Sequence, residues 1–401
     1  MTHPPRAGAL PRRLLWSWLA FVLTAQALLG FLGVADLWTR GHNGWNGGAY
    51  HLAARNTLRW GLLFPLQYDA GTVPPTGADV YTHHPLALHL HDTASLWLFG
   101  DHPAAIRGVA AVHAVLALAM LFLLVRRYWS DLHAVVASGV YLLLPVNAIY
   151  LNMANHSSGF LFWSLLALYC YLAYQRAMDA GGQAGRWYAA TLAAFWVAAQ
   201  WDWPAYYVAF GMAVHWLVAG VARLRRTGRP CWRWDRHLGG LAGFCVLVLA
   251  SFGGHFLLVE IVTGNLSELG GTFEKRQDVP WSRFREHLKV VPELMFTWPV
   301  LALCGGWVAA YVVRLARGRA RARDLVPVVY AYGGVIHYLV FKWSAVVHSY
   351  WAWTTLPFVA IACATSLVAA GGWVARRAAP RIGRRGALAA GAAVGLALVP
   401  L

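Results

Sequence analysis

The sequence is poor in charged residues, and poorest in acids. Of its 401 residues, 12% are charged and 59% are hydrophobic, whereas soluble domains contain about 25% charged residues. Only 16 residues are Asp or Glu, against 33 Lys or Arg. This composition excludes an ordinary soluble globular protein. The 22 Trp and 17 Tyr residues, many of them at the ends of apolar runs, are typical of the aromatic belts of membrane proteins.

Cysteine is also scarce. The five cysteines lie in or beside apolar segments and show no paired spacing, which argues against a disulfide framework and against a zinc site. We therefore predict no metal-binding residues. The need for a divalent cation or another cofactor is left open, because no residue pattern indicates one.

Long apolar runs make up most of the chain and predict an all-α, multi-pass membrane protein. A helix needs about 20 residues to cross the hydrocarbon core. About eleven runs are candidates, although the fifth is short and the last is weak. We interpret residues 1–401 as a single transmembrane domain. The predicted spans are Leu14–Val34, Val109–Val125, Ala134–Tyr150, Phe160–Tyr174, Tyr188–Ala199, Ala205–Ala222, Leu238–Val262, Pro299–Val313, Leu325–Phe341, Thr354–Ala370 and Ala387–Leu401.

The basic residues predict the orientation of these spans. With a cytoplasmic N-terminus, 23 of the 33 basic residues fall on the inner side, which satisfies the positive-inside rule at every inner segment. No A-x-A site follows the first run, so we expect an anchor and not a cleaved signal peptide. The predicted location is a cell membrane, with a bacterial inner membrane favoured. The net charge of +17 then reflects topology and anionic inner lipids, not nucleic acid.

The varied polar residues fall in the outer loops, so an active site is expected to face outward. The first outer loop, residues 35–107, is predicted to carry two amphipathic surface helices, Ala49–Leu63 and Pro85–Phe99. Between them, Leu66–Thr82 reads as irregular. In the outer loop 264–298 we expect another surface helix, Arg283–Met295. This loop is interpreted as a solvated face or, alternatively, as a lid.

Several polar clusters in these loops have both a functional and a structural interpretation. Asp36 begins the first outer loop, either as a solvated acid or as a catalytic one. His83 and His84 precede the second surface helix, where imidazoles can bind phosphate or shuttle protons. Asn155 and His156 either cap the fourth span or contact a substrate.

Two further outer turns carry the same ambiguity. Asp202 lies in the tight turn Gln200–Pro204 and either caps the sixth span or projects into an outer cavity. Lys342 ends the ninth span, where a lysine either extends to the interface or offers a point charge to a lipid-linked phosphate. His348 and Tyr350 follow it in the last outer loop.

Together these motifs resemble those of the GT-C membrane glycosyltransferases. The resemblance is to the bacterial relatives of protein O-mannosyltransferases, glycosyltransferase family 39, and of the lipid A aminoarabinose transferase. The motifs match in order and sidedness over most of the chain. They are G-G-A-Y-x-x-x-A-R-N at Gly47–Asn56, Y-x-H-H-P-L at Tyr81–Leu86, a short outer loop before the fourth span, D-W-P at Asp202–Pro204 and H-x-Y-W at His348–Trp351.

The resemblance implies an inverting transfer of a sugar from a polyprenyl- or dolichyl-phosphate donor to a lipid, glycan or protein acceptor. In the family, a carboxylate of the first outer loop is the base on the acceptor hydroxyl, and basic residues hold the donor phosphate. This sequence departs from the family at Asn46-Gly47, where relatives place an acidic pair. It also has Ser157 where relatives often carry Glu. An amide cannot take up a proton at neutral pH.

We therefore expect the base to be Asp36 in the first place and Asp202 in the second, with a histidine as a further alternative. Arg55, Lys342 and His348 are expected to bind the donor phosphate. The full set of predicted substrate-binding residues is His42, Asn46, Arg55, His83, His84, Asn155, His156, Lys342, His348 and Tyr350.

Two other classes of function are weighed against this one. The missing acidic pair favours a non-catalytic relative that binds lipid-linked sugar or scaffolds a cell-envelope complex. A transporter is disfavoured, because the sequence has no inverted repeat and no matched pair of interrupted spans.

Overall fold

The computed structural model describes residues 10–38, 41–61, 82–227, 236–264, 266 and 279–397. Within these ranges the chain forms helices and no strands. The helices are α1 (Arg12–Phe31), α2 (His42–Trp60), α3 (Ala87–Phe99), α4 (Pro103–Tyr128), α5 (Asp131–Leu143), α6 (Pro145–Tyr150), α7 (His156–Asp179), α8 (Gly185–Trp201), α9 (Pro204–Thr227), α10 (Arg236–Thr263), α12 (Trp281–Phe296), α13 (Trp298–Ala316), η2 (Ala322–Asp324), α14 (Leu325–Val340), α15 (Lys342–Val347), η3 (Ser349–Thr355) and α16 (Leu356–Ala397).

Seven helical segments among the described residues are long and apolar enough to cross a membrane. They are α1, α4, α7, most of α9, α10, α13 and the segment Ser349–Arg377 of η3 and α16. The helices α10 and α13 have few buried residues, and in α10 Leu249 and Ile261 are each 70% exposed. Apolar side chains exposed to this extent fit a lipid environment. The predicted all-α membrane architecture is therefore confirmed.

Every predicted span falls on a helix, but two predictions differ in detail. The span predicted at Ala134–Tyr150 is two helices, α5 and α6, which meet at Pro145. Proline lacks a backbone N–H and its ring crowds the preceding turn, so it breaks a helix there. The last predicted span is the end of α16 and no separate helix, and its residues 398–401 lie outside the described ranges.

The outer surface helices are also found, with shifted bounds. The first is α2, which begins at His42, seven residues before the predicted start at Ala49. The second is α3 and the third is α12. Residues 66–81 of the predicted irregular segment and residues 267–278 of the predicted lid lie outside the described ranges.

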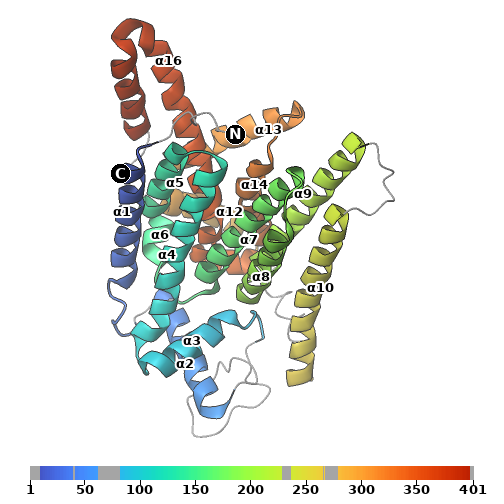
Figure 1. Ribbon diagram of the computed structural model, residues 1–401. Coiled ribbons are helices and arrows are strands. Elements are labelled where there is room, and N and C mark those ends of the chain that lie inside the picture. The colour runs from blue at the N-terminus through green and yellow to red at the C-terminus, as the bar shows by residue number, and fades with distance from the viewer. Residues whose placement is uncertain are drawn as a thin grey trace.

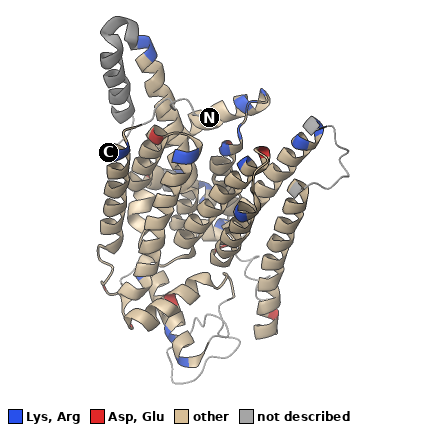
Figure 2. Ribbon diagram, in the orientation of Figure 1, with Lys and Arg blue, Asp and Glu red and all other residues tan. Residues whose placement is uncertain are grey.

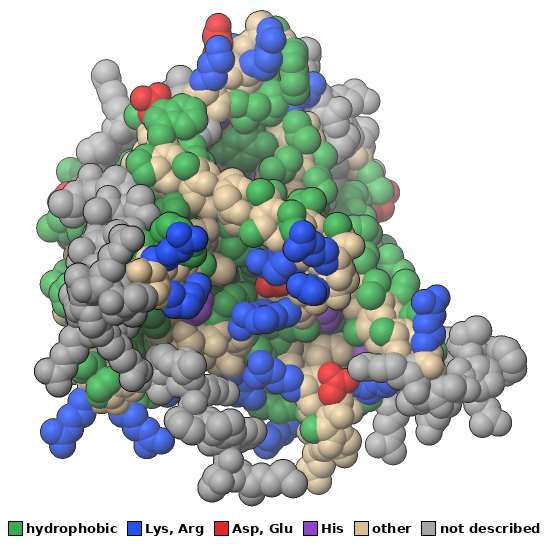
Figure 3. Space-filling view, turned by 90° about the horizontal axis from the view of Figure 1, so that it is seen from above, with side chains coloured by type: hydrophobic (Ala, Val, Ile, Leu, Met, Phe, Trp, Pro, Cys, Tyr) green, Lys and Arg blue, Asp and Glu red, His purple; other side chains and the backbone are tan. Residues whose placement is uncertain are grey.

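The long helices stand side by side, and α2 and α3 lie across one end of them (Figure 1). The opposite end carries most of the Lys and Arg side chains (Figure 2). Seen from that end, they gather around the middle of the face (Figure 3). Arg127 of α4, Arg176 of α7 and Arg323 of η2 lie close to one another, around Tyr128. The molecule thus has one strongly basic end and one end closed by surface helices.

Aromatic rings hold the basic end together. Arg176 lies 4.2 Å from the ring centre of Tyr128, and Arg127 lies 5.0 Å from that of Tyr169. Arg323 donates a hydrogen bond to the backbone carbonyl of Tyr128 at 2.7 Å. Cation–π contacts of this kind attract a guanidinium to the ring face. These contacts join α4, α7 and the segment before α14.

The contact between α7 and α8 is very close. Trp201, the last residue of α8, is fully buried, and its indole lies directly on Gly159 of α7. A Cβ atom added at Gly159 would overlap the indole ring. Only glycine allows this approach, which brings the start of α7 to the end of α8.

The first prediction concerns this contact. Gly159→Ala should lower the free energy of unfolding by about 1–3 kcal/mol, because Trp201 must move in a filled core. Thermal unfolding of the purified protein in detergent measures the effect. Gly108→Ala in α4 is the matched control, since its added Cβ meets no atom within 4 Å. Equal melting temperatures for the two variants would contradict the prediction.

A carboxyl group is enclosed in α3. Asp92 is fully buried, and no described residue hydrogen-bonds to either of its oxygens. Burial raises the pKa of Asp92 well above its ordinary value. The unfolded chain ionises this group near pH 3.9. The folded protein therefore holds this proton more tightly, and its stability falls as the pH rises from that value toward the raised pKa.

The second prediction follows from this loss of stability with rising pH. Asp92→Asn should raise the melting temperature at pH 8, because the amide is neutral without taking up a proton. The gain should shrink toward pH 4, where both forms are neutral. Asp36→Asn, a change at an exposed acid, is the control and should show no such pH-dependent gain. A melting-temperature difference that is constant between pH 4 and pH 8 would disprove the mechanism.

Candidate active site

A cavity opens at the end of the bundle that α2 and α3 cover. Its volume is about 670 Å³ including its open mouth. Five parts of the chain line it: α2, the segment before α3, the turn at the start of α7, the turn at the start of α9, and the segment from Ser344 to Trp351. The lining residues are Trp45, Asn46, Ala49, Tyr50, His84, Asn155, His156, Ser157, Asp202, Ser344, His348, Tyr350 and Trp351.

The helix α2 forms one wall of this cavity. Asn46 and Tyr50 are four residues apart and therefore lie on the same face of α2. The ring of Tyr50 packs against His156, with 5.4 Å between ring centres. On another side, the indole of Trp38 covers Gly47 so closely that a Cβ atom there would overlap it. This contact fixes how Asn46 faces the cavity.

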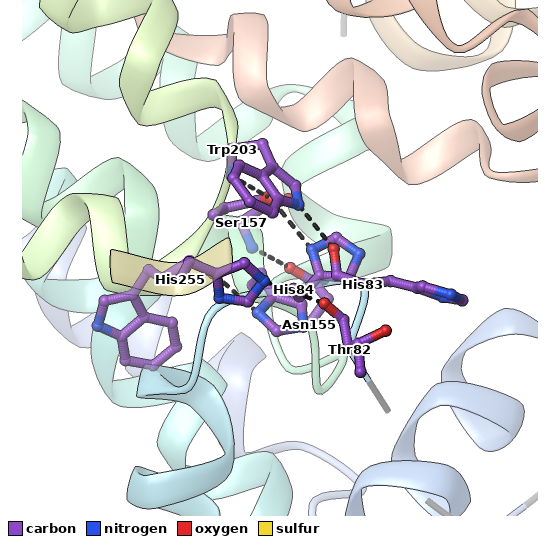
Figure 4. Close-up of polar contacts among 10 residues, drawn as sticks. Thr82, His83, His84, Asn155, Ser157, Trp203 and His255 are labelled. Carbon is purple, nitrogen blue, oxygen red and sulfur yellow. Dashed lines mark hydrogen bonds and ion pairs between the residues drawn. The ribbon is translucent and has the colours of Figure 1, made fainter. Parts of the chain in front are cut away.

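The segment before α3 is held at two backbone carbonyls (Figure 4). Trp203 Nε1 donates a hydrogen bond to the carbonyl oxygen of His83 at 2.6 Å, and His255 Nε2 donates to that of Thr82 at 3.1 Å. These bonds tie the segment to α9 and α10. The His84 side chain lines the cavity.

The start of α7 forms the opposite wall. Asn155 Oδ1 accepts a hydrogen bond from the backbone N–H of Ser157 at 2.6 Å, which is the predicted helix cap. His156 Nδ1 lies 2.8 Å from the carbonyl oxygen of Trp201. A carbonyl can only accept, so Nδ1 carries the hydrogen, and the neutral ring presents a lone pair at Nε2.

The carboxylate of Asp202 meets two imidazoles in this cavity. Asp202 is 6% exposed, and its Oδ1 lies 3.3 Å from His84 Nδ1. The same oxygen accepts the backbone N–H of Trp203 at 2.8 Å. The ring of His84 stacks on His156 with 4.2 Å between ring centres.

Three buried polar atoms beside this cavity have no hydrogen-bond partner among the described residues. They are Asn46 Nδ2, Asn155 Nδ2 and His156 Nε2, on side chains that are 7%, 1% and 3% exposed. Two of them are donors and one is an acceptor. Buried polar atoms are rarely left without a partner. This set matches the hydroxyl groups of a sugar, each of which can donate and accept.

A second cluster of rings lies at the other side of the cavity. His42 lies 5.6 Å from His348 and 5.7 Å from Tyr350, measured between ring centres. Burial lowers the pKa of His42. Tyr150 and Ser349 share a hydrogen bond of 2.6 Å beneath this cluster. No Arg or Lys is among the described residues that line the cavity.

Seven of the twelve predicted site residues line the cavity, namely Asn46, His84, Asn155, His156, Asp202, His348 and Tyr350. His42 packs against two of them. The other four are not among the lining residues. Asp36 is exposed, its carboxylate folds back over Gly33 and its backbone carbonyl accepts a bond from Arg107.

The predicted basic residues lie elsewhere as well. Arg55 pairs with Asp101 at 3.0 Å in a separate cavity beyond α2. Lys342 begins α15, two residues before the lining residue Ser344. His83 contributes its backbone carbonyl, which accepts the hydrogen bond from Trp203 that holds the segment before α3 in place.

Sequence reasoning missed several lining residues. Trp45, Ala49, Tyr50, Ser157, Ser344 and Trp351 also face the cavity. Tyr50 could have been found from its four-residue spacing to Asn46 on a predicted helix. Ser344 carries no such signal. Within the described ranges, no three His, Cys, Asp or Glu side chains are arranged to hold a metal ion.

Comparison with known proteins supports the resemblance drawn from the motifs. Residues 83–249, which include His84, His156 and Asp202, match the family of dolichyl-phosphate-mannose-protein mannosyltransferases. No curated protein matches the chain. Fourteen chains of solved structures do match it.

Among these structures is ArnT from Cupriavidus metallidurans bound to undecaprenyl phosphate, with a TM-score of 0.58 and 15% identity over 95% of this chain and 75% of ArnT. The oligosaccharyltransferase of Archaeoglobus fulgidus matches with a TM-score of 0.60 and 15% identity, over 97% of this chain and 55% of that one. The archaeal oligosaccharyltransferase AglB from Archaeoglobus fulgidus, in complex with an inhibitory peptide and a dolichol-phosphate, matches with a TM-score of 0.61 and 14% identity, over 96% of this chain and 54% of AglB.

At these identities the structural likeness establishes the fold. The chain therefore has the fold of the GT-C membrane glycosyltransferases, and its residues 83–249 match the dolichyl-phosphate-mannose-protein mannosyltransferase family.

Proposed function

We propose that this protein is a membrane glycosyltransferase that moves a sugar from a polyprenyl-phosphate donor to an acceptor hydroxyl, with inversion at the anomeric carbon. The observation that carries the proposal is Asp202, a carboxylate that lines the cavity beside His84. Asn46, at the position where the resembling enzymes place their acid, lines the same cavity. In this chain the base thus comes from the turn between α8 and α9.

In this reaction Asp202 takes the proton from the acceptor hydroxyl. The acceptor oxygen forms its bond to the anomeric carbon as the bond from that carbon to the phosphate oxygen breaks, and polyprenyl phosphate leaves with the bonding electrons. A base must lie within hydrogen-bond reach of the nucleophile. The bond from Trp203 and the pairing with His84 orient the carboxylate.

The three buried atoms without partners bind the transferred sugar in this proposal. Asn46 and Asn155 donate from their amides, and His156 accepts at Nε2. A site built this way discriminates strongly against a sugar that lacks the matching hydroxyl, because its buried polar atoms then stay unpaired.

The donor phosphate is assigned to the side of the cavity with His348 and Tyr350. His42 supports this side through its ring contacts. An imidazole N–H and a phenol O–H both donate to phosphate oxygens. The likeness to structures that hold undecaprenyl phosphate and dolichol-phosphate supports a lipid-linked donor. It also supports an acceptor that reaches the same cavity.

The proposed orientation places the cavity on the outer face of the membrane and the N-terminus in the cytoplasm. The clustering of arginines at the end opposite α2 and α3 supports it (Figures 2 and 3), because cytoplasmic ends carry the excess of Lys and Arg. A bacterial inner membrane is the proposed location.

The amide at Asn46 supports a second candidate, a non-catalytic protein that binds lipid-linked sugar. An amide in place of the family's acid removes the usual base and leaves the rest of the cavity in place. This candidate predicts that the purified protein binds polyprenyl-phosphate sugars and transfers none of them.

The third prediction separates these candidates. Asp202→Asn should lower kcat for transfer from polyprenyl-phosphate sugars by about 10²–10⁴, the usual contribution of a general base. Asp36→Asn, at the exposed acid outside the cavity, is the matched control and should leave kcat unchanged. The measurement is transfer by each purified variant from a panel of lipid-phosphate sugars. If Asp202→Asn keeps full activity, the proposed base is wrong.

The fourth prediction tests the phosphate side. His348→Ala should raise KM for the lipid donor by roughly tenfold or more, because a hydrogen bond to a charged group is lost. Lys342→Gln removes the nearby cation that does not line the cavity and should change KM by less than about twofold. Initial rates over a range of donor concentrations measure both. The reverse ranking would move the phosphate to Lys342.

A further inference from the structure

A second cavity lies on the far side of α2 from the candidate active site. Its volume is about 730 Å³ including its opening. It shares no lining residue with the first cavity. Its lining residues are Arg55, Asn56, Leu58, Arg59, Leu96 and Asp101.

The geometry of α2 explains this separation. Successive residues turn by 100° around a helix axis, because a turn takes 3.6 residues. Arg55 and Arg59 therefore lie on the face opposite Tyr50 and Asn46. The helix is thus a wall between two cavities, one of which the transfer reaction does not use.

The charge in this second cavity is unbalanced. Asp101 is its one acid among the described residues. The two oxygens of Asp101 are already engaged, one by His51 Nε2 at 2.6 Å and the other by Arg55 Nε at 3.0 Å. Arg59 makes no ion pair with a described residue, and its guanidinium rests 4.7 Å from the ring centre of Trp60. The cavity therefore presents an excess of positive charge to a ligand.

Apolar side chains form the edge of the same cavity. Leu58, from α2, is 47% exposed. Between the lining residues Leu96 and Asp101, the last turn of α3 exposes Trp97 by 74%, Leu98 by 63% and Phe99 by 76%. Aromatic and aliphatic groups exposed together mark a surface that meets lipid or a partner. Here the exposed residues directly follow Leu96 in sequence, which lines the cavity together with two arginines.

We propose that this cavity binds the phosphate headgroup of an anionic lipid. The guanidinium groups of Arg55 and Arg59 bind the phosphate oxygens, and the acyl chains lie along Leu58 and the last turn of α3. Guanidinium suits this task because its planar fork matches two phosphate oxygens at once. The site is independent of the proposed sugar transfer, since no residue is shared.

Asp101 connects the ligand to the rest of the outer layer. It holds His51, whose Nδ1 accepts a hydrogen bond from Trp38 Nε1 at 3.1 Å, and Trp38 in turn covers Gly47. A phosphate on Arg55 therefore rests on the same helix that carries Asn46.

The fifth prediction is tested with the full-length protein in detergent micelles. Short-chain phosphatidylglycerol, short-chain phosphatidylcholine and inorganic phosphate are added separately, and native mass spectrometry measures the dissociation constants. The variants are the double substitution Arg55→Gln with Arg59→Gln, and Arg59→Gln alone, which leaves the Asp101 pairs intact. Arg285→Gln, at an exposed arginine of the outer helix α12, is the matched control.

We expect the wild-type protein to prefer phosphatidylglycerol, and the double variant to bind it ~20-fold more weakly, since each cation near an anionic lipid contributes roughly fivefold. Arg59→Gln alone should lose about fivefold, and Arg285→Gln should match the wild type. Unchanged binding in Arg59→Gln, or an equal loss in Arg285→Gln, would overturn the proposal. Inorganic phosphate that binds as tightly as the lipid would indicate a free anion and would overturn the assignment to a lipid.

Discussion

The hydrogen bond from His156 Nδ1 to the carbonyl of Trp201 fixes the start of α7 against the end of α8. The buried indole of Trp201 on Gly159 holds the same two helices at their closest approach. Asn155 directly precedes His156 in the chain, and Asp202 directly follows Trp201. Two helix ends that are far apart in sequence therefore deliver their polar side chains to one cavity, and the bond also sets which nitrogen of His156 faces it.

The second constraint is the rotation of α2 about its axis. Trp38 packs on Gly47, and the indole N–H of Trp38 bonds to His51, which itself pairs with Asp101. These contacts fix which face of the helix meets α7 and which faces the other way. As a result, the polar residues of α2 face two different cavities. Asn46 lines the candidate active site, and Arg55 lines the second cavity. A helix held less tightly would not separate the two environments.

The sequence was sufficient to predict what depends on sidedness. His84, Asn155, Asp202 and His348 all line one cavity, and hydropathy with arginine counting predicted that their connections share one side. It was not sufficient to predict what depends on rotation and packing. Arg55 was expected at the donor phosphate because the motif A-R-N is polar, but spacing along a helix does not say which neighbour its face meets. Asp36 was expected in the site because it is acidic and near, while the chain reversal at Gly33 turns its carboxylate away.

The charge of the cavity favours different roles for Asp202 and Asn46. Asp202 is the one carboxylate among its described lining residues, and no guanidinium or ammonium group accompanies it there. The backbone N–H of Trp203 donates a hydrogen bond to this carboxylate, and the imidazole of His84 lies 3.3 Å from it. An acid at position 46 would have added a second negative charge across the same cavity, and like charges in one site raise each other's pKa. In the proposed reaction Asp202 is the base, and the neutral amide of Asn46 binds a hydroxyl. The amide of Asn46 and the carboxylate of Asp202, which line the same cavity, are therefore two parts of one proposed electrostatic arrangement.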